Sequence, residues 1–261
     1  MTKTVQVRRR GALRPHEVPP EIVEALSLGI IETSNFSEQV ALDQRTLLAS
    51  VVPQAAHRSA DLEAVRLIDR MWAGAGLVLS VLGDRVVTAG RDWISDTARA
   101  WAAMAVSLMP GLSLKERLEL LQPYVDDDHF AVREWVWIGF RPHILPNPSQ
   151  GISALVPWTY ADQERRRRFA SESTRPIGVW APHIPELKQR PALGLPLLSQ
   201  LNCDPSRYVQ LSVGNWLNDA AKTNPGWVRK VCENWLQNGS SAATLAICKR
   251  GMRSIRNQTE V

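Results

Sequence analysis

Two segments of the sequence carry the same order of residue types, and this repetition limits the possible fold more than any other feature. The matching positions are Asp128, Val132 and Trp135 in one segment, and Asp204, Val209 and Val213 in the other. An aspartate followed by an apolar stripe at helical spacing predicts a capped amphipathic helix. A chain that repeats such a helix is predicted to stack helices in pairs, and stacks of this kind form long concave surfaces.

Helical periodicity covers most of the remaining chain, and no alternating β pattern persists. The helices are predicted at about 37–52, 60–73, 92–109, 114–126, 130–141, 163–172, 193–203, 206–223, 226–237 and 241–255. Breaks are predicted at proline and glycine positions, including Gly74–Gly76, and Leu77–Leu82 is interpreted as a small-residue helix or turn. Residues 142–158 and 173–185 are predicted to be irregular. We therefore predict an all-α, HEAT-like helical repeat solenoid with a concave basic face.

The domain organisation predicted from these patterns is simple. Residues 1–18 are expected to be a flexible basic arm, and residues 19–261 a single HEAT-like repeat domain. No apolar run was found to reach the length of a membrane span, and the N-terminus lacks the apolar segment of a secretory signal. The three cysteines have no CxxC spacing, which favours reduced thiols over zinc ligands or disulfides. A cytoplasmic location is expected.

Positive charge is concentrated in the second half of the chain. Residues 1–125 carry 14 Lys and Arg against 14 Asp and Glu, whereas residues 126–261 carry 17 against 12. A basic half on a repeat scaffold indicates a polyanionic partner, most simply nucleic acid. The alternative is ordinary solvated surface charge.

The helix predicted at 130–141 combines charged and aromatic side chains. Arg133 and Trp137 are four residues apart, so the guanidinium can stack on the indole. Glu134 lies among apolar neighbours and is therefore either paired or retained for function. The structural alternative is an ion pair of Glu134 with Arg133 or Arg141.

Four consecutive arginines, residues 165–168, lie on the next strongly charged helix. They cannot all face one side, so one or two of them, such as Arg165 or Arg168, are predicted to contact a nearby polyanion. The alternative is a solvated charged face. Glu172 follows at the end of this helix, where a pair with Arg168 or Arg175 is the alternative to a catalytic role.

The helix predicted at 206–223 places polar residues beside its apolar stripe. Asn215, Asn218 and Asp219 must there be hydrogen-bonded or functional. For Asp219 the alternatives are a capping role or an ion pair with Lys222 or Lys230. Carboxylates of this kind can stabilise positive charge on a sugar, and an indole such as that of Trp180 can attract a cationic base.

These three segments resemble the AlkC/AlkD superfamily of HEAT-like repeat DNA glycosylases, and the AlkC branch more closely. The matching motifs begin at Phe130, Arg168 and Tyr208 and run to Glu134, Trp180 and Pro225, respectively. They occur in order at compatible spacing. The resemblance covers roughly residues 15–256, and its specific part is 124–225.

The resemblance implies excision of cationic N-alkylated bases, chiefly 3-methyladenine with 3-methylcytosine as a second substrate, without a conventional base-flipping pocket. It implies double-stranded DNA as the partner and no cofactor or metal. The implied catalytic residues are Glu172, Glu134 and Asp219. The implied lesion or sugar contacts are Trp180 and Trp137, and the implied DNA contacts are Arg133, Arg165, Arg168, Arg175 and Lys222.

Several further expectations complete this interpretation. Some AlkC-type proteins carry a C-terminal immunoglobulin-like domain, and none is expected in this chain. A monomer that associates with the bacterial nucleoid when bound to DNA is expected. Two other hypotheses remain open: a non-catalytic nucleic-acid-binding repeat protein, and a scaffold for protein interactions.

Overall fold

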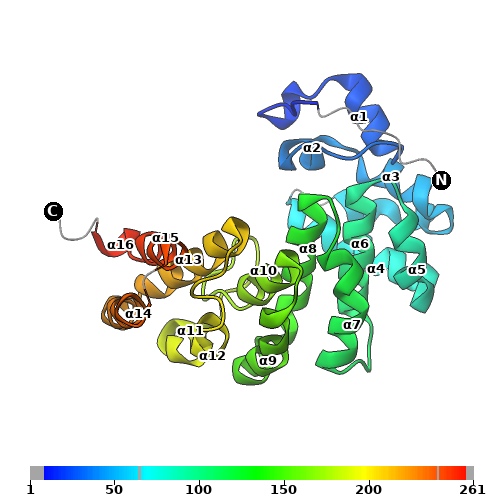
Figure 1. Ribbon diagram of the computed structural model, residues 1–261. Helices are drawn as coiled ribbons and strands as arrows, with labels where there is room; N and C mark the ends of the chain where they lie inside the picture. The colour runs from blue at the N-terminus through cyan, green and yellow to red at the C-terminus, as the bar shows by residue number, and fades with distance from the viewer. Residues whose placement is uncertain (1–8, 64–65, 240, 257–261) are drawn as a thin grey trace. The chain divides into compact units, whose positions relative to one another are not determined.

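The computed structural model describes residues 9–63, 66–239 and 241–256, and all regular structure within them is helical (Figure 1). The all-α prediction is therefore confirmed. Residues 19–261, predicted as one domain, divide into two compact units. Unit 1 comprises Met1–Leu112 and Asp127–Val136, and unit 2 comprises Ser113–Asp126 and Trp137–Val261. The concave basic face stays a prediction.

Unit 1 is built around two long helices, α4 (Leu67–Leu82) and α6 (Asp96–Leu108), which pack against each other. The helix α6 is buried over nearly its whole length, and Ser95 caps its first turn. The remaining elements are η1 (Pro15–Glu17), α1 (Pro20–Ser27), α2 (Phe36–Ala41), α3 (Gln44–Val51), η2 (Pro53–Glu63), η3 (Gly83–Arg85), α5 (Val86–Ala89), η4 (Gly90–Asp92) and the first part of α8 (Phe130–Phe140).

Unit 2 is organised around α13 (Arg207–Ala221), which packs against α10 (Glu164–Ser173), α14 (Pro225–Gln237) and α15 (Ala242–Gly251). The helix α13 is therefore central to unit 2, and most of its residues are buried. The other elements are α7 (Leu114–Val125), the end of α8, η5 (Arg141–His143), α9 (Pro148–Leu155), η6 (Val156–Tyr160), α11 (Pro185–Gln189), η7 (Pro191–Gly194), α12 (Leu195–Leu198) and α16 (Arg253–Arg256).

A recurring hydrogen-bond pattern gives the sequence repeat a structural basis. Arg99, Arg133, Arg167 and Gln210 each donate to the backbone carbonyls five and six residues earlier in the chain. The donors come from the first turns of α6, α8, α10 and α13, so the same contact ties each helix to the segment before it. Helices that repeat one local contact in this way are typical of helical-repeat proteins.

The segment 9–18, predicted as part of a flexible arm, is held against α2. Arg9 pairs with Glu38 and also donates to the Glu32 carbonyl at 2.9 Å. Asn35 and Ser37 donate to the carbonyls of Ala12 and Leu13. Residues 1–8 of the predicted arm lie outside the described residues.

The break predicted at Gly74–Gly76 is wrong, because α4 continues through both glycines. A Cβ atom at Gly74 would lie 2.3 Å from Nε1 of Trp101 on α6. Glycine is therefore required there by the close approach of two helices rather than by a turn. The predicted helix at 60–73 is likewise replaced by the end of η2 and the start of α4.

The expectation that no apolar run reaches membrane length also needs correction. The helical run Leu67–Asp92 is long and apolar enough to cross a membrane, judged by length and composition alone. The same properties describe a core helix, and α4 buries Met71, Ala75, Leu77 and Val78. This run therefore gives weak evidence for a membrane location.

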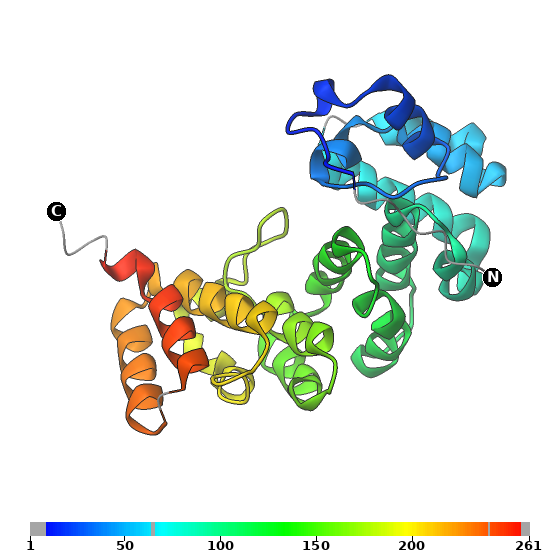
Figure 2. The same cartoon turned by 45° about the horizontal axis from the view of Figure 1, so that its top comes forward.

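The prediction of irregular structure is wrong for one of its two segments and largely confirmed for the other. Residues 142–158 are wrongly assigned, because they contain α9 and two 3₁₀ turns. Residues 174–184 form neither helix nor strand, which confirms most of the second assignment. Figure 2 shows this segment standing out from the helices of unit 2 as an open loop.

Candidate functional site

An ion cluster at the C-terminal end of α10 brings together three of the residues predicted to form the site. Arg175 donates from Nε to Asp219 Oδ2 at 2.9 Å and from Nη1 to Glu172 Oε2 at 3.1 Å. Glu172 and Asp219 are 3% and 4% exposed. Burial lowers the pKa of Arg175, but the Glu172 and Asp219 carboxylates outweigh that effect and raise it overall. The cluster therefore consists of two buried carboxylates that share one guanidinium.

Two further cations complete the cluster. Arg168 Nη2 lies 3.6 Å from Glu172 Oε1, and Lys222 Nζ lies 3.7 Å from Asp219 Oδ1. The Arg168 guanidinium also stacks over the ring of Tyr208, with its carbon 4.4 Å from the ring centroid. The pairs expected as structural alternatives for Glu172 and Asp219 are thus present, apart from the Lys230 pair. Each carboxylate faces two cations.

Arg141 is the residue of this site that the sequence analysis missed. It is 0% exposed and donates to the carbonyls of Ser173, Arg175 and Pro182, at 3.2, 2.5 and 2.6 Å. Burial, followed by the positive charge of Arg175, lowers its pKa to about 10. The ion pair of Arg141 with Glu134, considered as an alternative from the sequence, stays a prediction. Arg141 binds both ends of the loop 174–184.

Trp180 occupies this loop in an unusual backbone conformation. Its φ is 61°, and among the described residues it is the one non-glycine residue with a positive φ. The turn is tight, because a Cβ atom at Gly178 would lie 2.5 Å from the Ala181 carbonyl oxygen. The Trp180 side chain is 49% exposed. A large aromatic in a strained conformation is a recognised feature of functional loops.

The four consecutive arginines of α10, residues 165–168, do not form a solvated face. Each of them contacts a group within the protein. Arg167 pairs with Asp204, and Arg166 pairs with Asp126. Arg165 donates to the Asp126 carbonyl at 2.5 Å. All four arginines of the run are only partly exposed. The predicted DNA contact of Arg165 stays a prediction, and Arg168 is the member that joins the ion cluster.

Glu134 and Arg133 belong to unit 1, whereas the ion cluster belongs to unit 2. Glu134 is half-buried on α8, and Arg133 uses Nη1 to bind the carbonyls of Asp127 and Asp128. Their predicted catalytic and DNA-binding roles stay predictions. Trp137 is 4% exposed and packs in the core, and its predicted contact with a lesion or sugar stays a prediction.

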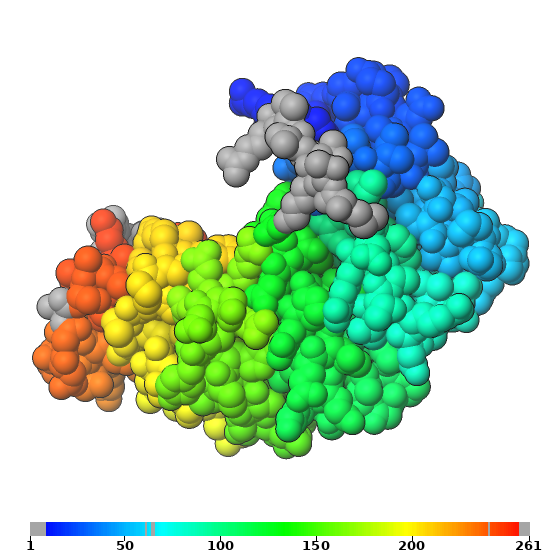
Figure 3. All heavy atoms as spheres, turned by 45° about the vertical axis from the view of Figure 1, so that its right-hand side comes forward, coloured from blue at the N-terminus to red at the C-terminus, as the bar shows by residue number. Residues whose placement is uncertain are grey.

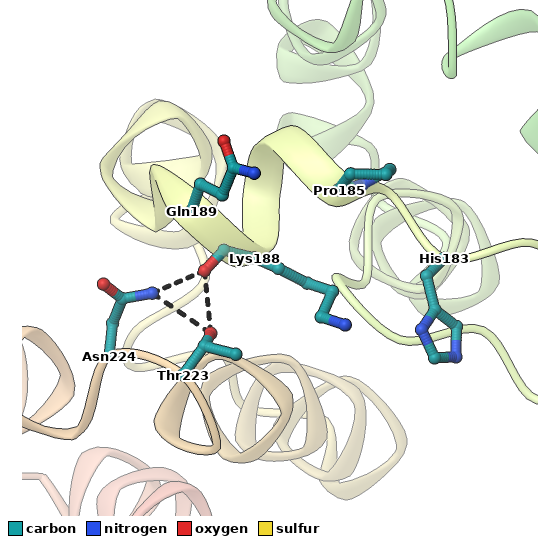
Figure 4. A pocket seen from close by; sticks show the side chains of 6 residues that line it. All are labelled: His183, Pro185, Lys188, Gln189, Thr223 and Asn224. Carbon is teal, nitrogen blue, oxygen red and sulfur yellow. Dashed lines mark hydrogen bonds between the residues drawn. The ribbon is translucent and has the colours of Figure 1, made fainter.

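A shallow pocket of about 580 Å³ lies near the end of the same loop (Figure 4). It is lined by His183, Pro185, Lys188, Gln189, Thr223 and Asn224. Its floor is fixed by the Lys188 carbonyl, which accepts hydrogen bonds from Thr223 Oγ1 at 2.7 Å and Asn224 Nδ2 at 2.5 Å. None of the residues predicted from the sequence lines it.

Over 9–63, 66–239 and 241–256, no group of three or more His, Cys, Asp or Glu side chains is placed to hold a metal ion. The carboxylates of the ion cluster are bound by arginine and lysine, which are poor neighbours for a cation.

The repeated helices and the buried ion cluster define a helical-repeat protein whose charged site lies at the end of a helix. Its fold is that of AlkC. A search of solved structures finds the Pseudomonas fluorescens alkylpurine DNA glycosylase AlkC, bound to DNA containing an abasic site analog, with a TM-score of 0.69. The match covers 95% of this chain and 66% of that chain at 21% sequence identity. The AlkC-like fold predicted from the sequence is therefore confirmed.

Sequence comparison adds one bacterial relative. This chain is 40% identical over 115 residues to the uncharacterized protein YhaZ of Bacillus subtilis (strain 168). The matched stretch is 44% of this chain and 32% of that protein, so the likeness spans about a third of the relative. No protein-family model matches the sequence.

Proposed function

We propose that this chain is a monofunctional DNA glycosylase that hydrolyses the N-glycosidic bond of cationic N-alkylated bases. The proposed substrates are double-stranded DNA containing 3-methyladenine and, secondarily, 3-methylcytosine. The AlkC-like fold supports this class of activity. The observation that carries the proposal is the pair of buried carboxylates, Glu172 and Asp219, beside the loop that presents a half-exposed Trp180.

The proposed chemistry follows from the charge of the substrate. Alkylation places positive charge on the base and weakens its bond to deoxyribose, so the base needs no protonation before it leaves. As the bond breaks, positive charge develops on the sugar, and a fixed carboxylate stabilises it electrostatically. The same carboxylate can orient the attacking water.

The roles of the individual residues differ. Glu172 is the proposed group that faces the sugar or its water, since it lies at the end of α10 where the loop begins. Asp219 and Arg175 hold Glu172 in place, and Trp180 offers an aromatic face to the cationic base. Glu134, from unit 1, is proposed as a third carboxylate of the reaction.

Incubation with DNA treated with a methylating agent, followed by chromatography of the released bases, tests the proposal. Wild-type protein is expected to release free 3-methyladenine without added metal or nucleotide. Glu172→Gln removes the charge but keeps the shape of the side chain, and release should fall by about 100-fold or more. DNA binding should change little.

A matched control is Glu119→Gln, which makes the same change on an exposed residue of α7 in unit 2. This variant should release bases at the wild-type rate. Wild-type protein that binds DNA but releases no base would support the non-catalytic nucleic-acid-binding protein instead. Equal release by Glu172→Gln and wild type would remove the residue assignment but not the activity.

We infer the DNA partner and the cytoplasmic location from the proposed activity itself. A glycosylase of this kind acts in the cytoplasm of a bacterium, on the nucleoid, and a monomer is sufficient for it. Size-exclusion chromatography with light scattering would test the monomeric state directly.

A further inference from the structure

Two glycines allow α15 to approach α13 closely in unit 2, where the helices lie side by side (Figure 1). A Cβ atom at Gly214 would lie 2.8 Å from Cβ of Arg250, and one at Gly251 would lie 2.7 Å from Cβ of Leu217. The stem of Arg250 therefore lies directly over the backbone of α13. Such an approach fixes the stem of an otherwise flexible side chain.

Two asparagines of α13 then orient two arginines. Asn215 Oδ1 accepts a hydrogen bond from Arg250 Nε at 2.8 Å. Asn218 Oδ1 accepts one from Arg253 Nε at 2.5 Å, and its Nδ2 donates to Ser254 Oγ at 2.5 Å. Asn218 is 1% exposed, so its amide is a fixed part of the core. Asn215 and Asn218, two of the three polar residues flagged on this helix, are therefore hydrogen-bonded, and each accepts from an arginine.

The groups that accept hydrogen bonds from Arg250 and Arg253 distinguish these two arginines from others in the protein. Arg99, Arg167 and Arg175 bind carboxylates, whereas Arg250 and Arg253 are held by neutral amides. Among the residues that the structure describes, neither forms an ion pair with a carboxylate, and each uses Nε alone. The two terminal nitrogens of each guanidinium thus make no hydrogen bond within the described part of the chain.

Positive charge accumulates around this pair. Burial lowers the pKa of Arg250, and the nearby charges of Arg253 and Arg207 lower it further. Arg207 is exposed on the first turn of α13. Arg175 of the ion cluster also acts on Arg250, which places the pair within electrostatic reach of that cluster. The Glu172 carboxylate opposes this effect and raises the Arg250 pKa, but burial and the three cations outweigh it. Like charges held close together are stabilised by an anionic ligand.

We propose that Arg250 and Arg253, oriented by Asn215 and Asn218, form a phosphate-binding site for the backbone of duplex DNA. A guanidinium anchored through Nε presents its two terminal nitrogens as a fork that matches phosphate oxygens. Two guanidinium groups on consecutive helical turns suit the regularly spaced phosphates of a DNA backbone. Figure 3 shows α13, α14 and α15, in yellow to orange-red, as one continuous packed surface at this end of unit 2. The choice of DNA as the polyanion rests on the proposed function.

The test measures binding to an unmodified DNA duplex by fluorescence anisotropy over a series of salt concentrations. The double variant Arg250→Gln, Arg253→Gln keeps the side-chain stems but removes both charges. Its affinity should fall by about tenfold or more, and the slope of log affinity against log salt should shrink by about one to two.

The matched control is Arg229→Gln, Lys230→Gln, which removes two positive charges from exposed positions of α14 in the same unit. Its affinity should fall by about twofold at most, with a nearly unchanged slope. Equal losses in the two double variants would overturn the proposal, because net charge alone would then explain the binding. A loss that is larger for an RNA duplex than for DNA would overturn the assignment to DNA.

A second variant tests the orientation of the guanidinium. Asn215→Leu keeps every charge and suits a helix, but it removes the acceptor that fixes Arg250. Binding should weaken by about threefold to tenfold although the net charge is unchanged. Wild-type affinity in this variant would show that the asparagine does not orient the site.

These results can be separated from a failure of the proposed glycosylase. If the wild type binds duplex DNA but releases no alkylated base, the loss in the Arg250 and Arg253 variant still decides the phosphate site. If base release at saturating protein stays normal in that variant while affinity falls as expected, both proposals stand. If release is normal and affinity is unchanged, the phosphate site fails by itself.

Discussion

Arg99 in unit 1 and Arg175 in unit 2 each lie between two carboxylates, yet their surroundings differ. Arg99 makes five hydrogen bonds, to Asp127, Glu32 and two backbone carbonyls. Arg175 makes two, one to each of its carboxylates. In both cases burial lowers the arginine pKa and the carboxylates raise it by more. Within the described residues, Arg99 thus uses all five of its N–H donors, whereas only two of the Arg175 donors are hydrogen-bonded.

The balance of charge differs as well. In unit 2, Glu172 and Asp219 also face Arg168 and Lys222, so the cations in contact outnumber the acids. A saturated arginine with balancing acids stabilises the fold. An arginine with spare donors in a cation-rich site is arranged for an anionic ligand or for a reaction. We therefore propose a structural role for the Arg99 pairs and a functional role for the Arg175 cluster, although both contain the same residue types.

Arg99→Met should give the largest loss of stability. It leaves Asp127 and Glu32 without their shared cation, and breaking such a buried network costs about 3 kcal/mol of unfolding free energy. Urea denaturation followed by circular dichroism measures it. Arg66→Met is the control, because the Arg66–Asp69 pair is exposed and its loss should be undetectable. Similar curves for both variants would contradict the structural role of Arg99.

Arg175→Met should cost less stability but more activity. Glu172 and Asp219 keep their contacts with Arg168 and Lys222, so we expect a loss of about 2 kcal/mol. Base release should fall by about 100-fold, because the carboxylates lose the guanidinium that fixes their geometry.

Arg175→Lys is the informative companion of that variant. It retains the charge but cannot bind both carboxylates with one planar fork. Intermediate base release is expected, with stability closer to the wild type. A methionine variant with normal release would show that the ion cluster serves only the fold.

Trp180→Gly should have the smallest effect on stability. Glycine relieves the positive φ but adds freedom to the unfolded chain, so the unfolding free energy should change by less than about 1 kcal/mol. Base release should nevertheless drop by about tenfold, since the aromatic face is gone. Trp180→Phe keeps an aromatic ring and should retain most activity. Normal release by the glycine variant would exclude Trp180 from the site.

The sequence predicted those features that depend on neighbours in the chain. The end of α10 places Arg168, Glu172 and Arg175 at spacings of three and four residues, so their contacts follow from helix geometry. The all-α fold follows from the same periodicity. Asp219 was singled out as a polar residue beside the apolar stripe of its helix, and its catalytic role came from the family resemblance. Its contact with Arg175, across 44 residues of sequence, appears only in the structure.

Other features depend on contacts between distant residues. The continuity of α4 through Gly74 is set by Trp101, which the periodicity of α4 does not reveal. The role of Arg141 depends on carbonyls up to 41 residues away, and its one visible signal was an arginine within the apolar stretch around Phe140 and Ile144. Contacts between residues this far apart in the sequence can be identified only from the three-dimensional fold.

The way Arg141 binds both ends of the loop 174–184 bears on how the molecule would tolerate a cut chain. The Ile184 amide donates to the Pro176 carbonyl at 3.0 Å, and Trp216 donates to the Thr174 carbonyl at 2.9 Å, so the two sides of the loop are joined independently of its tip. A protease nick beside Val179 would leave two fragments still docked. The same position is therefore suited to a split-protein reporter, in which separately expressed halves reassemble.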